Sequence, residues 1–358
     1  MVPKEYYGRL FTKEQLPVDY HSEASTLESM IKVDKQIRCK RCYSQIEEDW
    51  QLPEGQYYCR ACIVFGRNQE GKELYYFPSK TSEIEFPVLK WLGELTPYQA
   101  EVSENLLVTY QKQKDSLVHA VTGAGKTEMI YKIVAYVLEN KGRVAIASPR
   151  VDVCRELFLR MQGDFTCSIS LLHAESEPYD GSPLVIATTH QLLKFYQNFD
   201  LVIVDEVDAF PFVGNVMLNH AVEQAKKETG RYIYLTATST LSLEEQVRLG
   251  ALEKHHLARR FHGNPLVLPK FFWQGRLQKS LMRGKLPRPL VYQIKKQRKS
   301  KFPLLIFFPN IAIGEKFTSI LQNYLPDEKM GFVSSKSEER SATVEQFREK
   351  ELSILVTT

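Results

Sequence analysis

The stretch AVTGAGKTE, residues 120–128, decides the fold. It follows a short apolar run and leads directly into Lys126–Asn140, whose apolar residues recur with helical spacing. Gly123 and Gly125 allow backbone amides to turn inward and wrap a polyphosphate. The pattern G-x-x-x-x-G-K-[ST] is matched except at its first position, which is Ala120. A strand, a glycine-rich loop and a helix in this order predict a nucleotide site on a parallel α/β sheet.

The residues of this loop suit ATP with Mg²⁺. Lys126 would neutralise charge on the β- and γ-phosphates, and the Thr127 hydroxyl would complete the coordination of Mg²⁺. The residues expected to surround the phosphates with their backbone are Thr122, Gly123, Ala124 and Gly125.

The second half of the site is the stretch FDLVIVDEVD, residues 199–208. Four apolar residues predict a buried strand, and its carboxyl end is where ligands bind in open parallel sheets. Asp205 would hold the Mg²⁺ shell, and Glu206 would orient or deprotonate the attacking water. Asp208 fits two roles equally well, a helix cap or a functional carboxylate.

Further apolar runs alternate with helical segments, which predicts a mostly parallel sheet with right-handed crossovers. The expected strands are Ser116–Ala120, Arg143–Ser148, Leu184–Thr188, Leu201–Val204 and Tyr232–Leu235, and a further helix is expected at Val216–Thr229. A second α/β pattern comprises a strand at Phe302–Phe308, a helix at Ile313–Tyr324, a strand at Met330–Val333, a helix at Glu338–Lys350 and a strand at Ser353–Val356. Because the sequence ends at Thr358, just after a strand, we expect this second domain to be truncated.

Four of the six cysteines form two C-x-x-C pairs: Cys39 with Cys42, and Cys59 with Cys62. Two such pairs can close a tetrahedron around Zn²⁺, and the segment between them is too small for a core of its own. A redox-active pair is the alternative interpretation. Four sulfur ligands leave no position for a catalytic water, so the predicted zinc is structural.

The net charge is only +4, but it is unevenly distributed. The stretch from Lys254 to Gly314 has no Asp or Glu and 14 Lys and Arg, which predicts a local site for a polyanion. The candidates for contact with a nucleic-acid backbone in its densest part are Lys295, Lys296, Arg298 and Lys299.

Aromatic residues are interleaved with these cations: Phe261, Phe271, Phe272, Trp273 and Tyr292. Exposed rings stack on unpaired bases, whereas buried rings would belong to a core. We favour the core, because large rings are usually buried. The adjacent His255 and His256 match no metal spacing and are expected at the surface.

The sequence has no apolar run near the ~18 residues that a membrane span requires. Its start, MVPKEYYGRL, lacks the apolar core of a secretory signal. We therefore expect a cytoplasmic protein without direct membrane insertion. Any position at the inner face of the membrane would depend on a partner.

The loop, the DEVD box and TAT at Thr236–Thr238 together resemble the helicase and translocase superfamily that includes DEAD-box proteins. The resemblance covers roughly residues 95–358. It implies a RecA-like P-loop motor domain followed by a second RecA-like domain, and it assigns coupling to Thr236 and Thr238. Gln99, in LTPYQ, is similar to the residue that reads adenine. The loops that grip the nucleic-acid backbone correspond to Ser148, Arg150, Thr188 and Thr189.

A four-cysteine module placed before such a motor resembles the late competence protein ComFA family. That resemblance implies an ATP-dependent translocase that drives single-stranded DNA into the cytoplasm during natural transformation. It also implies a membrane DNA channel and a cytosolic competence factor as partners, and it is compatible with an oligomer. The helicase PriA is similar in its motor, but its zinc cysteines follow the P-loop. A zinc-containing docking module with weak ATPase activity is a further alternative.

These features divide the chain into six parts. Before the motor we expect an N-terminal arm at 1–35, a four-cysteine zinc module at 36–68 and a connector at 69–90, where the arm is either mobile or packed on the zinc module. The motor would comprise a first RecA-like ATP-binding domain at 91–252, a basic linker at 253–300 and a partial second RecA-like domain at 301–358. The family's second domain carries an arginine-finger motif of the type Q-x-x-G-R-x-x-R, which these residues lack. Such an arginine is worth on the order of 10³–10⁵ in rate, so this chain is expected to bind ATP but hydrolyse it slowly.

Overall fold

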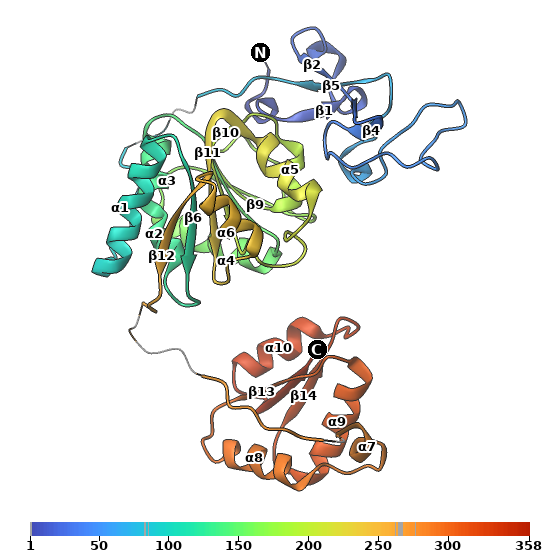
Figure 1. The fold of residues 1–358 in the computed structure, drawn as a ribbon, viewed down its shortest axis with the longest axis vertical. Coiled ribbons are helices and arrows are strands. Elements are labelled where there is room, and N and C mark those ends of the chain that lie inside the picture. Colours follow the sequence, from blue (N-terminus) through green and yellow to red (C-terminus); the bar gives the residue numbers. More distant parts are fainter. Residues whose placement is uncertain (1, 82–83, 85, 262, 264–267, 276) are drawn as a thin grey trace. The chain divides into compact units, whose positions relative to one another are not determined.

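The computed structural model describes residues 2–81, 84, 86–261, 263, 268–275 and 277–358. The chain divides into two compact units, Met1–Leu266 and Val267–Thr358. The strands of each unit pair only within that unit (Figure 1), and the buried hydrophobic clusters do not mix residues of the two units.

The first unit is built on a seven-stranded sheet in which every neighbouring pair is parallel. In spatial order its strands are β12 (Leu252–Leu257), β6 (Asp115–Ala120), β11 (Lys226–Thr236), β10 (Phe199–Asp205), β7 (Val144–Ser148), β9 (Leu184–Thr188) and β8 (Ile169–Leu172). In the register, Val202 of β10 lies between Ala145 of β7 and Tyr232 of β11. The predicted α/β class with a parallel sheet is confirmed.

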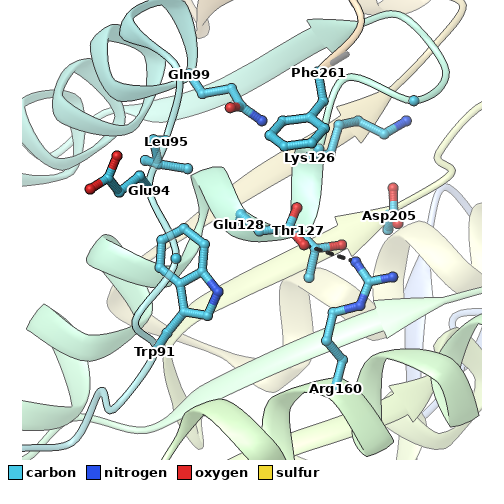
Figure 2. A pocket seen from close by; sticks show the side chains of 13 residues that line it. Trp91, Glu94, Leu95, Gln99, Lys126, Thr127, Glu128, Arg160, Asp205 and Phe261 are labelled. Atoms are coloured by element: carbon cyan, nitrogen blue, oxygen red, sulfur yellow. Dashed lines mark hydrogen bonds and ion pairs between the residues drawn. The ribbon is translucent and has the colours of Figure 1, made fainter.

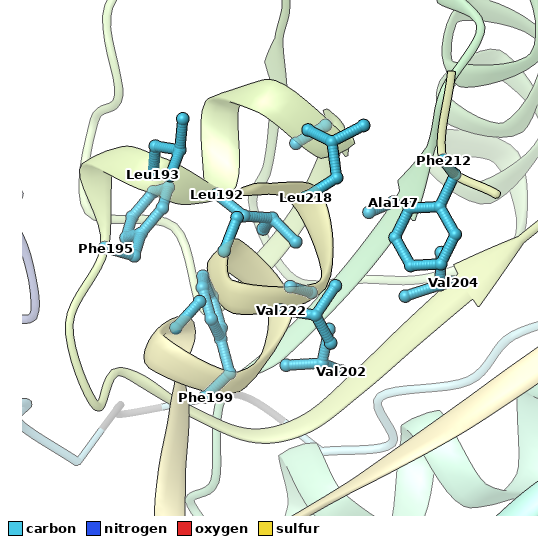
Figure 3. Close-up of a cluster of buried hydrophobic side chains, with 14 of the residues drawn as sticks. Ala147, Leu192, Leu193, Phe195, Phe199, Val202, Val204, Phe212, Leu218 and Val222 are labelled. Carbon is cyan, nitrogen blue, oxygen red and sulfur yellow. The ribbon is translucent and has the colours of Figure 1, made fainter. Parts of the chain in front are cut away.

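Both faces of this sheet are buried, which explains its continuous apolar strands. Along β10, Leu201 and Ile203 face one core, while Val202 and Val204 face the other. Figure 3 shows Val202 and Val204 packed with residues of η5 and α5. The first core is covered by α1 (Pro97–Gln111), α2 (Lys126–Met129), α3 (Tyr131–Glu139) and α4 (Val151–Asp164), and the second by η5 (Thr189–Lys194), α5 (Val216–Ala225) and α6 (Leu241–Arg248).

The N-terminal part of the chain forms small antiparallel sheets, and the described part of the predicted arm takes part in them. The elements from the arm to the connector are β1 (Leu10–Thr12), β2 (Ser25–Glu28), β3 (Met30–Val33), β4 (Gln36–Cys39), β5 (Glu73–Tyr76) and the short helices Lys4–Tyr6, Lys13–Gln15, Val18–Tyr20 and Ile63–Phe65. β5 pairs with both β1 and β2, although it lies in the predicted connector. Residues 82, 83 and 85 of that connector lie outside the described residues.

The cysteine module is packed against the motor sheet rather than tethered to it. The ring of Tyr43 stacks on His220 of α5 with centroids 5.1 Å apart, and His220 Nε2 lies 3.1 Å from the Lys40 carbonyl oxygen.

The N-terminal arm also approaches the motor domain closely, at Gly8. Gly8 has φ +69°, and a Cβ there would lie 2.0 Å from Asn198 Oδ1. Only glycine fits this contact between Gly8 and Asn198, because other residues would meet both backbone strain and a clash.

Two predicted helices end or break earlier than expected. The helix predicted at Val216–Thr229 stops at Ala225, because Lys226 turns extended and joins β11 beside Phe199. Tertiary strand pairing here overrides the helical pattern. The helix predicted at Lys126–Asn140 is divided by a turn at Ile130 into α2 and α3.

The second unit has a three-stranded parallel sheet, in the order β13 (Leu304–Phe307), β15 (Ile354–Thr357) and β14 (Met330–Val333). Its helices are α7 (Leu277–Met282), α8 (Arg288–Arg298), α9 (Ile311–Tyr324) and α10 (Arg340–Arg348). Its core includes Leu281 of α7, Ile294 of α8 and Phe317 of α9.

The predicted linker 253–300 is therefore not one connecting element. β12 at its start belongs to the sheet of the first unit, while α7 and α8 pack into the core of the second. Residues 262, 264–267 and 276 of this stretch lie outside the described residues. Within the described part of the chain, none of the helices is long and apolar enough to cross a bilayer.

Candidate active site

The glycine-rich loop connects the end of β6 to the start of α2. Gly123 and Gly125 both have left-handed backbones, with φ of +79° and +73°. A Cβ on Gly125 would lie 2.4 Å from Gln99 Nε2, so a side chain at this position would collide with the residue predicted to read adenine. The loop thus owes its shape to backbone freedom at two positions.

A cavity of about 530 Å³ opens at this loop (Figure 2). It gathers most of the predicted ATP and Mg²⁺ residues: Gln99, Gly123, Gly125, Lys126, Thr127 and Asp205. Thr122 and Ala124 stand in the loop but do not line the cavity; the former is exposed and the latter buried.

Asp205 ends β10 at the carboxyl edge of the sheet. Burial raises the pKa of Asp205 above its ordinary value, and the nearby Lys126 ammonium opposes the rise. One hydroxyl from Thr127 and one carboxylate beside a lysine form the donor set that phosphate with Mg²⁺ requires. The residues present therefore fit ATP with Mg²⁺.

Gln99 is largely occupied by contacts within the protein. Its Oε1 accepts from both the backbone nitrogen and the hydroxyl of Thr96, at 2.9 Å each, which closes the capping box of α1. Its Nε2 donates to the Ala124 carbonyl oxygen at 2.8 Å. One hydrogen on Nε2 is left to reach a nucleotide base.

Glu206, next to Asp205, adopts φ +56°, a conformation that is uncommon outside glycine. Arg150, predicted to contact DNA, extends instead toward this carboxylate, with Nη1 lying 3.6 Å from Glu206 Oε2. It also pairs with Asp152 at 2.5 Å. Burial raises the pKa of Glu206, and Arg150 opposes the rise. The structure thus links a predicted DNA contact to the predicted general base.

Asp208 does not cap a helix. Its Oδ2 accepts a hydrogen bond from the Thr238 hydroxyl. Thr236 Oγ1 in turn donates to the Thr238 carbonyl oxygen at 2.8 Å. Burial favours a higher pKa for Asp208, but hydrogen bonding, chiefly from the Thr238 hydroxyl, outweighs it and holds the pKa below its ordinary value. The DEVD box and the TAT segment are therefore physically joined.

Three predicted DNA contacts differ from expectation. Ser148 and Thr188 end neighbouring strands and pair in register, and Thr189 follows them. Their exposed fractions are only 0%, 7% and 0%, so these side chains do not present hydroxyls to a DNA backbone. The assignment of these positions to DNA contact therefore stays a prediction that would have to rest on their backbone groups. Arg150 remains half exposed at this edge.

The four cysteines of the predicted zinc module lie together and are fully buried. Their sulfur atoms all lie within 4.8 Å of one another. Hydrogen bonds from Cys42, Cys59 and Cys62 hold the pKa of Cys39 well below its ordinary range, whereas contact with Cys39 raises the pKa of Cys62. Four sulfurs this close cannot all ionise without a cation, and Zn²⁺ would supply that charge. Asn68 Nδ2 donates to Cys39 Sγ at 3.1 Å and would orient this ligand.

The predicted basic contacts of α8 divide into two kinds. Lys295, Lys296 and Lys299 are exposed. Arg298 is not available in the same way, because its side chain is only 10% exposed and its Nε pairs with Glu328 at 2.9 Å. Arg298 therefore serves the structure of the second unit.

The prediction that the interleaved aromatic residues belong to a core is wrong. Their exposed fractions are 58% for Phe261, 92% for Phe271, 66% for Phe272, 97% for Trp273 and 64% for Tyr292. The prediction for His255 is wrong in the opposite direction. It is buried in β12, with Nε2 lying 3.4 Å from the Thr109 hydroxyl of α1, while His256 is exposed as expected.

Sequence reasoning missed several residues that line the cavity. Trp91, Glu94 and Leu95 precede α1, Phe261 follows β12, and Arg160 reaches in from α4 to pair with Glu128 at 3.0 Å (Figure 2). These residues belong to no spacing pattern around the loop. Among the residues of this cavity that were missed, only Glu128 could have been found from the motif, because it directly follows the G-K-T sequence.

The chain is similar to known proteins in both sequence and fold. The family model for DEAD/DEAH box helicases matches residues 96–246. The chain is 54% identical over 357 residues to competence protein ComFA of Streptococcus pneumoniae, which covers 99% of this chain and 82% of that protein. It is 33% identical over 356 residues to competence protein ComFA of Bacillus subtilis, with 97% and 76% covered. Among solved structures, S. cerevisiae Dbp5 bound to RNA and ADP BeF3 matches with a TM-score of 0.52 and 12% identity, covering 74% of each chain. The last likeness supports the fold alone.

Proposed function

The chain belongs to the competence protein ComFA family, and from this membership and the P-loop cavity we propose that it is an ATP-driven motor moving along single-stranded DNA during DNA uptake. The observation that carries the proposal is the convergence of Lys126, Thr127 and Asp205 on one cavity at the carboxyl edge of the sheet. Bound ATP would supply the phosphoanhydride that is cleaved, and Mg²⁺ would offset the charge of its phosphates.

The residues of this chain would act on that bond in separate roles. Lys126 offsets the charge of the terminal phosphates, and Thr127 with Asp205 holds the metal. Glu206 is the candidate that orients the attacking water and accepts its proton. The bonded set of Asp208, Thr236 and Thr238 would transmit the state of the site to neighbouring elements.

The proposed substrate is a single strand, moved without processive unwinding. A second candidate is a PriA-like helicase that separates a duplex, and the motor's match to the DEAD/DEAH helicase model favours it. A pure docking module is less well supported, because the cysteine module shares a core with the motor sheet. The proposed partners remain a DNA channel and a cytosolic competence factor, with the protein held at the inner face of the membrane by them.

We propose further that the 358-residue polypeptide binds ATP but hydrolyses it slowly, since its sequence has no Q-x-x-G-R-x-x-R motif. Robust turnover by the purified polypeptide would contradict this part of the proposal.

The first test therefore measures binding instead of turnover. Fluorescent single-stranded and duplex oligonucleotides are titrated with the full chain, with and without a non-hydrolysable ATP analogue. Preferential binding of single strands, with an affinity that the analogue shifts in the wild type but not in Lys126→Ala, supports a motor. An affinity that the nucleotide does not change, or no binding of DNA at moderate salt, argues against it.

A further inference from the structure

The second unit begins with a segment whose large rings face solvent. We call Lys270–Gln274 the aromatic segment. Phe271 is 92% exposed, Phe272 is 66% exposed and Trp273 is 97% exposed. In the same unit Phe317 is 1% exposed and lies at the centre of the core, so this domain does bury rings that its stability requires. Three adjacent exposed rings leave a large apolar area in water, which is typical of an interaction site.

The charge around the aromatic segment indicates what would cover it. No acidic residue occurs from Lys254 to Gly314. Between Lys270 and Lys301, among the residues that the structure describes, the exposed cations without an ion pair or a side-chain hydrogen bond are Lys270, Lys279, Arg283, Lys285, Arg288, Lys295, Lys296, Lys299 and Lys301. Arg298 is the exception on α8, through Glu328. An apolar partner would not account for so many unmatched charges, whereas a polyanion would.

The helix α8 repeats the combination of a ring with cations. Tyr292 is 64% exposed and is followed at helical spacing by Lys295, Lys296 and Lys299, which share its face. Val291 and Ile294 face the core instead. Aromatic rings and unpaired lysines therefore occur together twice in this unit, in a segment outside its helices and strands and on a helix.

We propose that the aromatic segment is a stacking platform for the bases of single-stranded DNA, with the neighbouring lysines holding the phosphates. The inference rests on the proposed function for the identity of the strand. Stacking requires the free face of an unpaired base, so the platform favours single strands over duplex. The aromatic segment also lies outside the P-loop motifs and their cavity. The second unit would therefore bind DNA without requiring a bound nucleotide.

Trp273 provides a direct readout of this platform. In the free protein its emission should be that of an exposed indole and should be quenched readily by acrylamide. Addition of oligo(dT) should quench it further and protect it from acrylamide. Trp273→Phe keeps a ring and removes the reporter, so the signal of Trp50 and Trp91 is subtracted by comparing the two proteins. Oligo(U) and duplex DNA of equal length are the comparison ligands.

Affinity gives the second readout. Phe271→Ala and Trp273→Ala should each weaken binding of oligo(dT) by roughly 5- to 100-fold, the range for loss of one base–ring stack, with a smaller effect on duplex. Phe307→Ala is the matched control, since this ring of β13 is 70% exposed in the same unit and lies outside the platform. Circular dichroism and melting of every variant check that the fold is unchanged.

Three results would overturn the platform. One is emission of Trp273 that is already blue-shifted and protected without DNA, which would mean that protein covers it. Another is a signal from Trp273 that stays constant while labelled oligo(dT) binds normally, in which case the proposed motor function survives and the platform does not. The third is absence of DNA binding altogether, which would contradict both.

Discussion

The two units of the chain differ in how far their positive charges are matched. In the first unit several cations pair with carboxylates, as in Arg160 with Glu128 and Glu156, or Lys72 with Glu14, while others, such as Lys90 and Arg155, are exposed and have no such ion pair. Within the described part of the second unit, only Arg298 and Arg348 have a carboxylate partner. Surface ion pairs contribute little to stability, so this difference concerns what each unit meets in solution. The first unit encloses the candidate chemical site, and the second exposes unneutralised charge that suits the proposed polyanion.

The largest effect is expected from a change at Lys126 of the first unit. Replacing it with Ala removes the cation that faces the phosphates in the only P-loop of the sequence. We expect residual ATP hydrolysis to fall by at least about 100-fold, because this charge stabilises the transferred phosphoryl group. Hydrolysis is followed by phosphate release and nucleotide affinity by a fluorescent analogue. Turnover that persists in the variant would place the chemistry elsewhere.

Loss of the proposed zinc ion should affect the first unit alone. Cys62→Ser, or treatment with a strong chelator, should remove the cation that would let the four buried sulfurs coexist. Because these sulfurs share a core with η5 and α5, we expect the melting temperature of the first unit to fall by at least about 5 °C. Calorimetry resolves the transitions, and mass spectrometry counts the zinc.

Cys154→Ser is the control for this experiment, since Cys154 is equally buried but distant from the four sulfurs. Its substitution should leave the zinc content unchanged. An unaltered first transition in the zinc-free protein would show that the module does not support the motor.

The unpaired lysines of α8 should carry a measurable part of DNA affinity. Replacing Lys295, Lys296 and Lys299 with Ala removes three phosphate contacts, so the slope of log affinity against log salt should fall by about 2 for single strands. Binding at low salt should weaken about 10-fold. Arg248→Ala is the control, because Arg248 is exposed in the first unit but paired with Glu245. An equal effect of both changes would erase the contrast between the units.

The smallest expected effect concerns the pH dependence of hydrolysis. Burial raises the pKa of Glu206 and Arg150 opposes the rise. A general base acts when ionised, so activity is lost as the pH falls through this pKa. Arg150→Ala removes the opposing charge and raises the pKa further, which moves the acidic limb of the profile to higher pH. Arg150→Lys should restore much of the profile, and Arg155→Ala, at an exposed position of α4, should not shift it. An unshifted limb in Arg150→Ala would mean that Glu206 is not the titrating base.

Local sequence order was sufficient to predict the residues of the candidate site that would contact phosphate and metal. Lys126, Thr127 and Asp205 were predictable because each lies within a few residues of a strand end that fixes its position. Trp91, Arg160 and Phe261 reach the same cavity from separate elements, and only the three-dimensional fold brings them there. Local pattern cannot encode such convergence.

The errors have physical causes of the same kind. The helix after Val216 ends at Ala225 because Lys226 pairs with Phe199 on a neighbouring strand, a contact that helical periodicity does not register. The rings near Trp273 were assigned to a core from the average burial of aromatic residues, but the second unit fills its core from α7, α8 and α9. Average burial does not say which rings a small core has room for.

The contact between the cysteine module and α5 has a consequence for biosynthesis. Lys40 and His220, which meet at 3.1 Å, are 180 residues apart in the chain. Protein chains emerge from the ribosome with the N-terminus first, and domains tend to fold as they appear. The cysteine module is therefore exposed for the whole time in which the motor sheet is being made, with the face that α5 will cover still in water. Early capture of zinc would hold the module in shape during this interval, so metal supply at the time of translation should influence how much of the protein reaches its folded state.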